Sequence, residues 1–121
     1  MVNERRSRLA ACLGMLRNAL LGVSRLFIAT IPPRDLTITR IGVTRVRIRA
    51  YWKTHGRLPP GLPDLPPSPG RDNATVDGWG RALLYQVKGR STVTLTSLGA
   101  DGTAGGTGLD EDIVVSFDAS E

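Results

Sequence analysis

The sequence has little of the residue types that most catalytic and metal sites use. Its 121 residues include one cysteine, Cys12, and one histidine, His55. A single cysteine excludes an internal disulfide and a cysteine-based metal cage, and no zinc-ligand spacing occurs. Residues 102–106 lack the Lys-Ser/Thr pair that completes a phosphate-binding loop. We therefore expect no enzyme activity, because a soluble hydrolase would need His55 to leave its predicted turn and face a pocket beside a nucleophile.

Aromatic residues are also scarce, at 5% of the chain against 40% apolar residues in total. The core must therefore consist mainly of Val, Leu and Ile, and the length suits one small domain. The formal charge of +5 comes from arginines in the first half, while the acids gather after Asp64. Such an asymmetry is typical of a nucleic-acid binder, a protein on an anionic membrane surface, or a topogenic signal.

Residues 1–33 combine a basic N-terminus with an apolar run over residues 9–31. The run is close to the roughly 20 residues that cross a bilayer. Arg17 and Arg25 interrupt it, and a central arginine costs about 2.5–3.5 kcal/mol on insertion scales. A transmembrane anchor, an interfacial amphipathic helix and a buried helix all stay open, and we expect a membrane-associated helix. If it spans, the preceding arginines would keep the N-terminus cytoplasmic.

The segment 35–55 fits two kinds of secondary structure. Alternation of β-branched residues with Arg45, Arg47 and Arg49 is typical of a strand. As a helix, the segment would begin at an Asp35 N-cap and end at Gly56. Its apolar residues would then form two groups, Leu36, Val43, Val46 and Ala50 on one side and Ile38, Ile41, Ile48 and Trp52 on the other. We expect the three arginines to form a solvated face, although they could also contact phosphate.

The C-terminal half reads as a connector followed by strands. Six prolines predict an extended connector over residues 57–76, attached to the body by Leu58, Leu62 and Leu65. Residues 77–80 predict a tight turn, with Trp79 packed under the sheet. Strands are expected at 82–88, 92–97 and 113–117, the first two joined by a hairpin at Gly89-Arg90. The tail from Asp118 is polar and expected to fray.

A loop rich in glycine and acids separates the last two strands. Gly99, Gly102, Gly105, Gly106 and Gly108 allow positive φ at almost every second residue of this loop. Asp101 lies near its start, and Asp110, Glu111 and Asp112 lie at its end. Folding the loop back would bring these carboxylates together, and converging carboxylates repel unless a cation lies between them. Oxygen ligands without His or Cys suit Ca²⁺, which takes about 6–8 oxygens, but a merely solvated loop is the alternative.

Three motifs resemble one protein family, the major (G-type) pseudopilins of type II secretion systems. They are the loop Ser97-Leu98-Gly99-Ala100-Asp101-Gly102 to Asp110-Glu111-Asp112-Ile113, the turn Asp77-Gly78-Trp79-Gly80 with Tyr85, and Tyr51 with His55-Gly56-Arg57-Leu58-Pro59. The motifs occur in the family's order and cover about the C-terminal two thirds of the chain. The resemblance favours a helix at 35–55. It implies a pilin-like α+β domain over 34–121, an N-terminal helical part packed on a three-stranded antiparallel sheet (77–117) with a long Gly/Asp-rich calcium-type loop.

The resemblance also implies a site and a role. The calcium ligands would be the Leu98 carbonyl, Asp101 and Asp112, with Asp110 and Glu111 competing for a further place. The chain would be a structural subunit in the bacterial inner membrane, with a periplasmic domain that assembles with copies of itself and other secretion components. Family members begin with a Gly-Phe processing site and a Glu four residues after that Phe. We find no such site, which leaves processing open. The alternative function is a basic module that binds nucleic acid or an anionic surface through residues 34–57.

Overall fold

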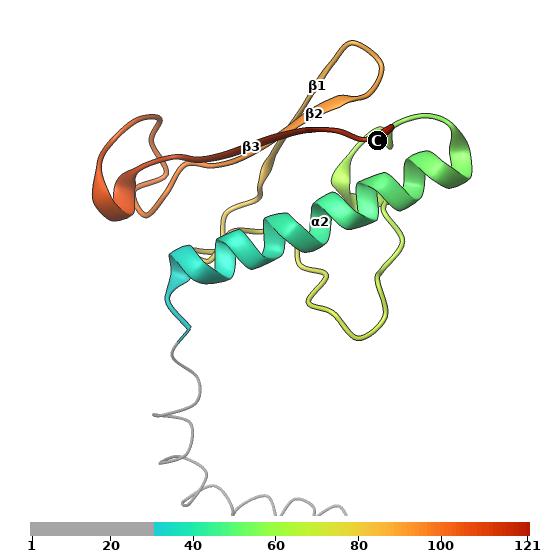
Figure 1. The fold of residues 1–121 in the computed structure, drawn as a ribbon. Coiled ribbons are helices and arrows are strands. Elements are labelled where there is room, and N and C mark those ends of the chain that lie inside the picture. The colour runs from blue at the N-terminus through green and yellow to red at the C-terminus, as the bar shows by residue number, and fades with distance from the viewer. Residues whose placement is uncertain (1–30) are drawn as a thin grey trace, which may run out of the picture. The chain divides into compact units, whose positions relative to one another are not determined.

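A computed structural model describes residues 31–121 of the chain. Residues Pro32–Glu121 form one compact unit, built from α2 (Pro33–His55), β1 (Leu84–Lys88), β2 (Thr92–Ser97) and β3 (Ile113–Asp118), with short 3₁₀ turns η2 (Leu62–Asp64) and η3 (Gly108–Asp110). One long helix lies along a three-stranded antiparallel sheet (Figure 1), which confirms the predicted α+β class. The predictions for the basic N-terminus and most of the apolar run fall outside the described residues. Within 31–121, no helix has the length and apolar character to cross a membrane.

Helix α2 begins two residues before the predicted start. Pro32 is the N-cap and Pro33 the first helical residue, so the predicted Asp35 N-cap is wrong and Asp35 lies in the first turn. Proline suits this position because the first amides of a helix have no intrahelical acceptor. The predicted end is confirmed, since Gly56 takes a left-handed φ of 70° and its amide donates to the Trp52 carbonyl at 2.7 Å.

The buried face of α2 differs from both predicted apolar groups. It follows the positions Thr37, Ile41, Thr44, Ile48 and Tyr51, which repeat every three or four residues. Ile38 and Val46, which we expected to share faces with core residues, are 51% and 49% exposed. A count of apolar residues misplaces the face because threonines occupy two of its positions. The hydroxyl of Thr37 donates to the Pro33 carbonyl at 2.7 Å, which allows its burial.

The sheet has the strand order β1-β2-β3, with both pairs antiparallel. The predicted hairpin and the strand at 92–97 are confirmed, and residues 89–91 form the turn. The first strand begins at Leu84 rather than at residue 82, and the third includes Asp118. On the side facing α2, Leu95 pairs with Tyr85 and Val115, and Val93 pairs with Val87 and Phe117. Leu95 and Val93 are fully buried in the centre of this face. The remaining members of the core are Ile41, Ile48, Tyr51, Leu62, Leu65, Leu83, Ile113, Phe117 and Ala119.

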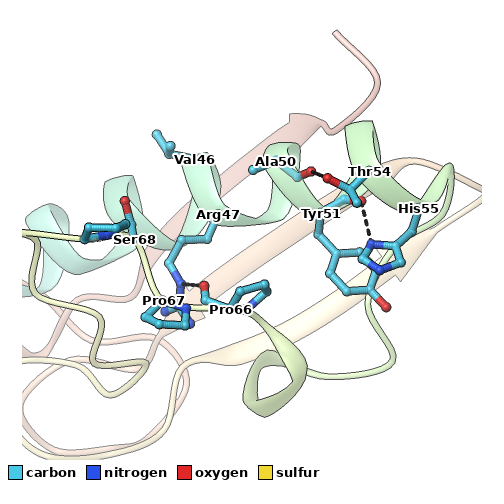
Figure 2. A pocket seen from close by; sticks show the side chains of 10 residues that line it. Val46, Arg47, Ala50, Tyr51, Thr54, His55, Pro66, Pro67 and Ser68 are labelled. Carbon is cyan, nitrogen blue, oxygen red and sulfur yellow. Dashed lines mark hydrogen bonds between the residues drawn. The ribbon is translucent and has the colours of Figure 1, made fainter.

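One buried arginine holds the connector against α2. Arg47 donates from Nε to the Pro66 carbonyl at 3.0 Å and from its two terminal nitrogens to the carbonyls of Leu65 and Asn73, both at 2.9 Å. Figure 2 shows the guanidinium beneath the helix, beside Pro66 and Pro67. The prediction that Arg47 lies on a solvated face is therefore wrong, and burial lowers the pKa of its guanidinium. The predicted attachment of the connector by Leu58, Leu62 and Leu65 is confirmed, because Leu62 and Leu65 are buried and Leu58 packs, partly buried, against the core.

The C-terminal tail is packed, so the expectation that it frays is wrong. Ala119 is buried and its amide donates to the Ser91 carbonyl at 2.8 Å. Asp118 accepts hydrogen bonds at Oδ1 from the amide of Ser120 at 2.9 Å and from its hydroxyl at 2.6 Å. The Ser120 hydroxyl is the main reason that the pKa of Asp118 lies below its usual value. The tail therefore joins the hairpin turn at the end of the sheet.

Candidate functional site

The carboxylate of Asp77 joins the turn at 77–80 to the end of β2, where the glycine loop begins. It is 1% exposed. Its Oδ1 accepts from the amides of Trp79 at 3.0 Å and Arg81 at 2.9 Å, and its Oδ2 accepts from the Ser97 hydroxyl at 2.7 Å. The first two bonds close the predicted turn at 77–80, and the third joins it to the end of β2. Trp79 is half-buried against the core, as predicted.

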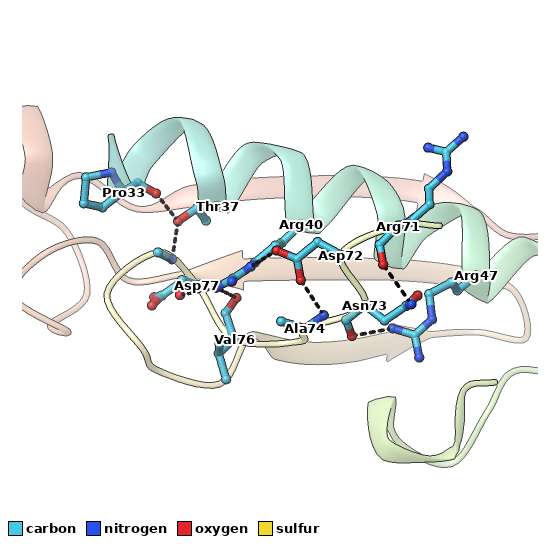
Figure 3. Close-up of polar contacts among 11 residues, drawn as sticks. Pro33, Thr37, Arg40, Arg47, Arg71, Asp72, Asn73, Ala74, Val76 and Asp77 are labelled. Carbon is cyan, nitrogen blue, oxygen red and sulfur yellow. Dashed lines mark hydrogen bonds and ion pairs between the residues drawn. The ribbon is translucent and has the colours of Figure 1, made fainter. Parts of the chain in front are cut away.

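Two side chains of α2 attach the helix to this turn (Figure 3). Thr37 Oγ1 accepts from the Gly78 amide at 2.7 Å, and only glycine fits there because a Cβ would collide with the Pro33 backbone. Arg40 donates to the Asp77 carbonyl at 3.3 Å and pairs with Asp72 at 2.9 Å. The Ala74 amide is the main cause, and Arg40 the second, of the lowered pKa of Asp72. The turn, and the loop that follows β2, are thus fixed to the N-terminal end of α2.

The glycine loop folds back so that its two ends meet. All five of its glycines take positive φ, between 61° and 96°, as the sequence predicts. The Ala100 amide donates to the Leu109 carbonyl at 2.8 Å across the base of the loop. A Cβ on Gly99 would lie 2.7 Å from the Asp110 carbonyl, so the close approach requires glycine at this position. The main chain therefore brings the beginning and the end of the loop together.

The acidic side chains of the loop do not form one cluster, although the two ends of its backbone meet. Asp101 is exposed, and its Oδ1 accepts from the Thr103 amide at 3.0 Å. Asp112 is half-buried, and both its carboxylate oxygens accept from the Gly105 amide at 3.1 Å. Asp110 is half-buried and Glu111 exposed, while Leu98, expected to offer its carbonyl, is half-buried at the end of β2. No group of three or more His, Cys, Asp or Glu residues that could hold a metal ion occurs in the described part of the chain.

A cation of the protein itself contacts this loop, and the sequence analysis missed it. Arg81 donates from one terminal nitrogen to the carbonyls of Gly99 and Ala100, both at 3.2 Å. Its guanidinium also lies against Gly102, where a Cβ would be 2.5 Å from Nε. Only its position directly after the turn at 77–80 could have drawn attention to Arg81. The sequence analysis also missed the structural role of Ser97. Its hydroxyl donates to Asp77 and accepts from the Gly99 amide at 3.3 Å, and no local sequence pattern indicates either partner.

Within residues 31–121, the contacts of the His55 ring are with Tyr51. The His55 ring stacks on Tyr51 with centroids 4.0 Å apart, and its Nδ1 is 3.2 Å from the Tyr51 carbonyl oxygen. These two residues lie at one end of a groove of about 270 Å³ between α2 and the connector. No acidic residue lines this groove, so the groove holds no carboxylate that could orient His55 as a base.

Three of the six arginines of segment 34–57 make contacts within the unit. Arg47 is buried among carbonyls, Arg40 pairs with Asp72, and the Arg49 guanidinium carbon lies 5.5 Å from the centre of the Phe117 ring. Phosphate contact requires exposed, uncommitted cations. These contacts commit Arg40, Arg47 and Arg49 to the unit itself, and no observation favours the alternative of a nucleic-acid or anionic-surface module.

Comparison with known proteins gives one match. Residues 68–116, about two fifths of the chain, match the family model described as "Type II secretion system (T2SS), protein G". The match confirms the resemblance across the turn at 77–80, β1, β2, the glycine loop and most of β3. It does not extend to the motif at Tyr51–Pro59. No curated protein and no solved structure matches the chain.

Proposed function

From the match of residues 68–116 to type II secretion system protein G, we propose that this chain is a structural, pseudopilin-like subunit of a type II secretion apparatus. The match carries the proposal, and the α+β layout with one long helix on a three-stranded sheet is consistent with it. Subunits of this kind stack through their helices into a short filament that acts in protein export. We place the chain in the bacterial inner membrane through residues 9–31, with residues 34–121 on the periplasmic side and copies of itself and other secretion components as partners.

Deletion and fractionation test this role. In the bacterium that carries the gene, deletion should lower the amounts of exported proteins in the medium, and the full-length chain should restore them. The full chain should sediment with the membrane fraction. An unchanged set of secreted proteins, together with recovery of the chain in the nucleoid or cytosol, would contradict the proposal.

We also propose that the glycine loop binds Ca²⁺ through the Leu98 carbonyl, Asp101 and Asp112, with Asp110 or Glu111 as a further ligand. The ends of the loop meet, and all candidate donors are oxygens, which suit this ion. Each carboxylate has about four lone-pair sites, so the amides that Asp101 and Asp112 already accept leave room for a cation. Calcium bound there would offset the repulsion among the four acids and connect the end of β2 to the start of β3.

Melting experiments with and without calcium test the ion. Calcium at a free concentration of 100 times its Kd would stabilise the folded chain by about 2.7 kcal/mol. Asp101→Ala and Asp112→Ala should each lower the melting temperature more in calcium than in chelator, where only the hydrogen bonds with the Thr103 and Gly105 amides are lost. Asp64→Ala, an exposed acid of the connector, is the control and should melt like wild type. Equal melting of the wild type in calcium and in chelator would refute the site, as would a calorimetric titration without heat.

A further inference from the structure

The base of the glycine loop (residues 98–112) is in contact with a cation that belongs to the chain itself. One terminal nitrogen of Arg81 donates to the carbonyls of Gly99 and Ala100, both at 3.2 Å. These two residues directly follow Leu98, whose carbonyl is one of the calcium ligands that we propose. A positively charged group therefore already binds two main-chain oxygens of the segment that we expect to face a metal ion.

The backbone of Arg81 is held at both of its polar groups by one buried residue. Its amide donates to Asp77 Oδ1 at 2.9 Å, and its carbonyl accepts from the Asp77 amide at 2.7 Å. Asp77 is 1% exposed and is bonded through Oδ2 to the Ser97 hydroxyl at the end of β2. The arginine side chain therefore extends from a fixed point beside the loop, so less conformational freedom is lost when its guanidinium binds there.

The loop has room for the guanidinium because a glycine lies against it. A Cβ on Gly102 would be 2.5 Å from the Arg81 Nε, and the φ of Gly102 is 68°. Gly108 has a similar φ of 61°, but the space around the position of its Cβ is open. Both positions favour glycine through their backbone conformation. Gly102 differs in that a side chain there would also displace the arginine.

The contact of Arg81 acts on the hydrogen bond that closes the loop. The Gly99 carbonyl, which accepts from Arg81, and the Ala100 amide belong to one peptide group. This amide donates to the Leu109 carbonyl at 2.8 Å, across the base of the loop. Hydrogen bonds in series polarise one another, so a cation at the oxygen of a peptide group strengthens the bond that its amide donates. Arg81 therefore stabilises the closed form of the loop.

The charge of the loop makes such a cation useful. Residues 98–112 contain four acids and no Lys or Arg, and Arg81 brings a positive charge to this segment from the neighbouring turn. A guanidinium stays protonated throughout the physiological pH range. It is also attached to the chain, so its contribution does not vary with the concentration of an ion in solution, whereas the stabilisation by a bound ion does.

We propose that Arg81 is a built-in counter-ion that keeps the glycine loop closed in the absence of calcium, so that calcium adds stability to a loop that is already formed. Arg81 is thus a positioning residue for the main-chain carbonyls at the base of the loop. The first part of this inference is independent of the proposed calcium site, and the second part rests on it.

Amide hydrogen exchange in the purified full-length chain, followed by NMR in chelator, tests the first part. The Ala100 amide of the wild type should be protected, because it is bonded to the Leu109 carbonyl. Arg81→Ala should speed the exchange of this amide about tenfold, the effect expected from losing partly exposed hydrogen bonds to a charged group. Arg81→Lys keeps the charge but not the fork of the guanidinium, so its rate should lie between these two.

Two controls show whether the effect is local. Arg90→Ala removes the same charge from the exposed hairpin turn at the other end of β2, and should leave the exchange of the Ala100 amide unchanged. The Gly56 amide donates to the Trp52 carbonyl at the end of α2. It should exchange at its wild-type rate in Arg81→Ala, because fraying of the helix end leaves the loop intact.

A pair of glycine variants displaces the guanidinium without changing Arg81. Gly102→Ala should speed the exchange of the Ala100 amide more than Gly108→Ala, because only the first places a Cβ against the arginine. In an Arg81→Ala background the two glycine variants should have the same effect, since the colliding group is gone. Equal effects of the two variants with Arg81 present would contradict its place against the loop.

The same measurement in calcium separates this proposal from that of the calcium site. Calcium should slow the exchange of the Ala100 amide in both the wild type and Arg81→Ala, because a bound ion favours the closed loop. Calcium without effect on either would overturn the second part, while tenfold faster exchange of Arg81→Ala in chelator would still support the first. A wild-type rate for Arg81→Ala in chelator would overturn the proposal, as would a wild-type amide that is protected only after calcium is added.

Discussion

Replacing Asp77 should destabilise the unit far more than replacing any exposed acid. Its carboxylate accepts from two amides and one hydroxyl and is almost fully buried. Asp77→Ala would leave three donors without a partner, and each buried unpaired donor costs about 1–3 kcal/mol. Three such donors would cost about 3–9 kcal/mol, but the Trp79 and Arg81 amides are only partly buried and could bind water instead. We therefore expect a loss of about 3–6 kcal/mol, which is a large part of the roughly 5–15 kcal/mol that a domain has in total.

Two other variants make the test specific. Asp77→Asn keeps one oxygen for the Trp79 and Arg81 amides and loses only the acceptor for Ser97, so we expect a loss of about 1–2 kcal/mol. Asp72→Ala is the control, because the Asp72 pair with Arg40 is exposed and worth about 0–1 kcal/mol. Urea unfolding followed by circular dichroism gives each free energy of unfolding. If Asp77→Ala were no less stable than Asp72→Ala, the view that this carboxylate holds the turn to β2 would be wrong.

Four further substitutions have defined outcomes. Gly99→Ala should cost more than about 2 kcal/mol, because it combines a positive φ with a collision against the Asp110 backbone. Gly105→Ala has the same kind of φ in open space and should cost only about 1–2 kcal/mol in the same urea assay. Arg47→Met should leave three connector carbonyls unpaired and expose the connector to limited proteolysis, read as faster cleavage near residues 66–73. Burial raises the pKa of Tyr85 above 10, so this residue's stabilisation is complete below pH 10 and falls as the pH rises through the folded pKa. Tyr85→Phe, which loses the 2.8 Å bond to the Pro59 carbonyl, should therefore melt with less dependence on alkaline pH than wild type, and identical slopes would contradict this origin.

Features that depend on local residue types were predictable from the sequence. Glycines with positive φ, the hairpin at Gly89, the end of α2 at Gly56 and the alternation along β2 all follow from the conformational preferences of single residues or short repeats. The conformation of these segments depends little on the residues that pack against them. The same is true of the meeting of the loop's two ends, since those ends are adjacent strands of one sheet.

Features that depend on distant partners were not predictable in this way. Arg47 is buried because carbonyls 18 to 26 residues away in the sequence converge on it, and no pattern within 35–55 signals that convergence. The burial of Thr37 on α2 depends likewise on a partner amide from Gly78. The contact of Arg81 with the loop carbonyls is a third case. Each is a polar group whose position depends on a partner that is distant in the sequence.

The bonds of Arg47 have a consequence for how the connector can vary in length. They fix the chain at Leu65, Pro66 and Asn73, and Asn73 bonds in turn to Ser68 and Arg71. Gly70 lies between these anchors at a φ of 76°, with open space around it. Residues inserted after Gly70 would lengthen the loop between Ser68 and Asn73 at the loss of the hydrogen bond from the Arg71 amide to the Ser68 carbonyl. Each doubling of the length of such a loop costs only about 0.6 kcal/mol. This position should therefore accept an epitope or a fluorophore-bearing peptide in an otherwise unaltered protein.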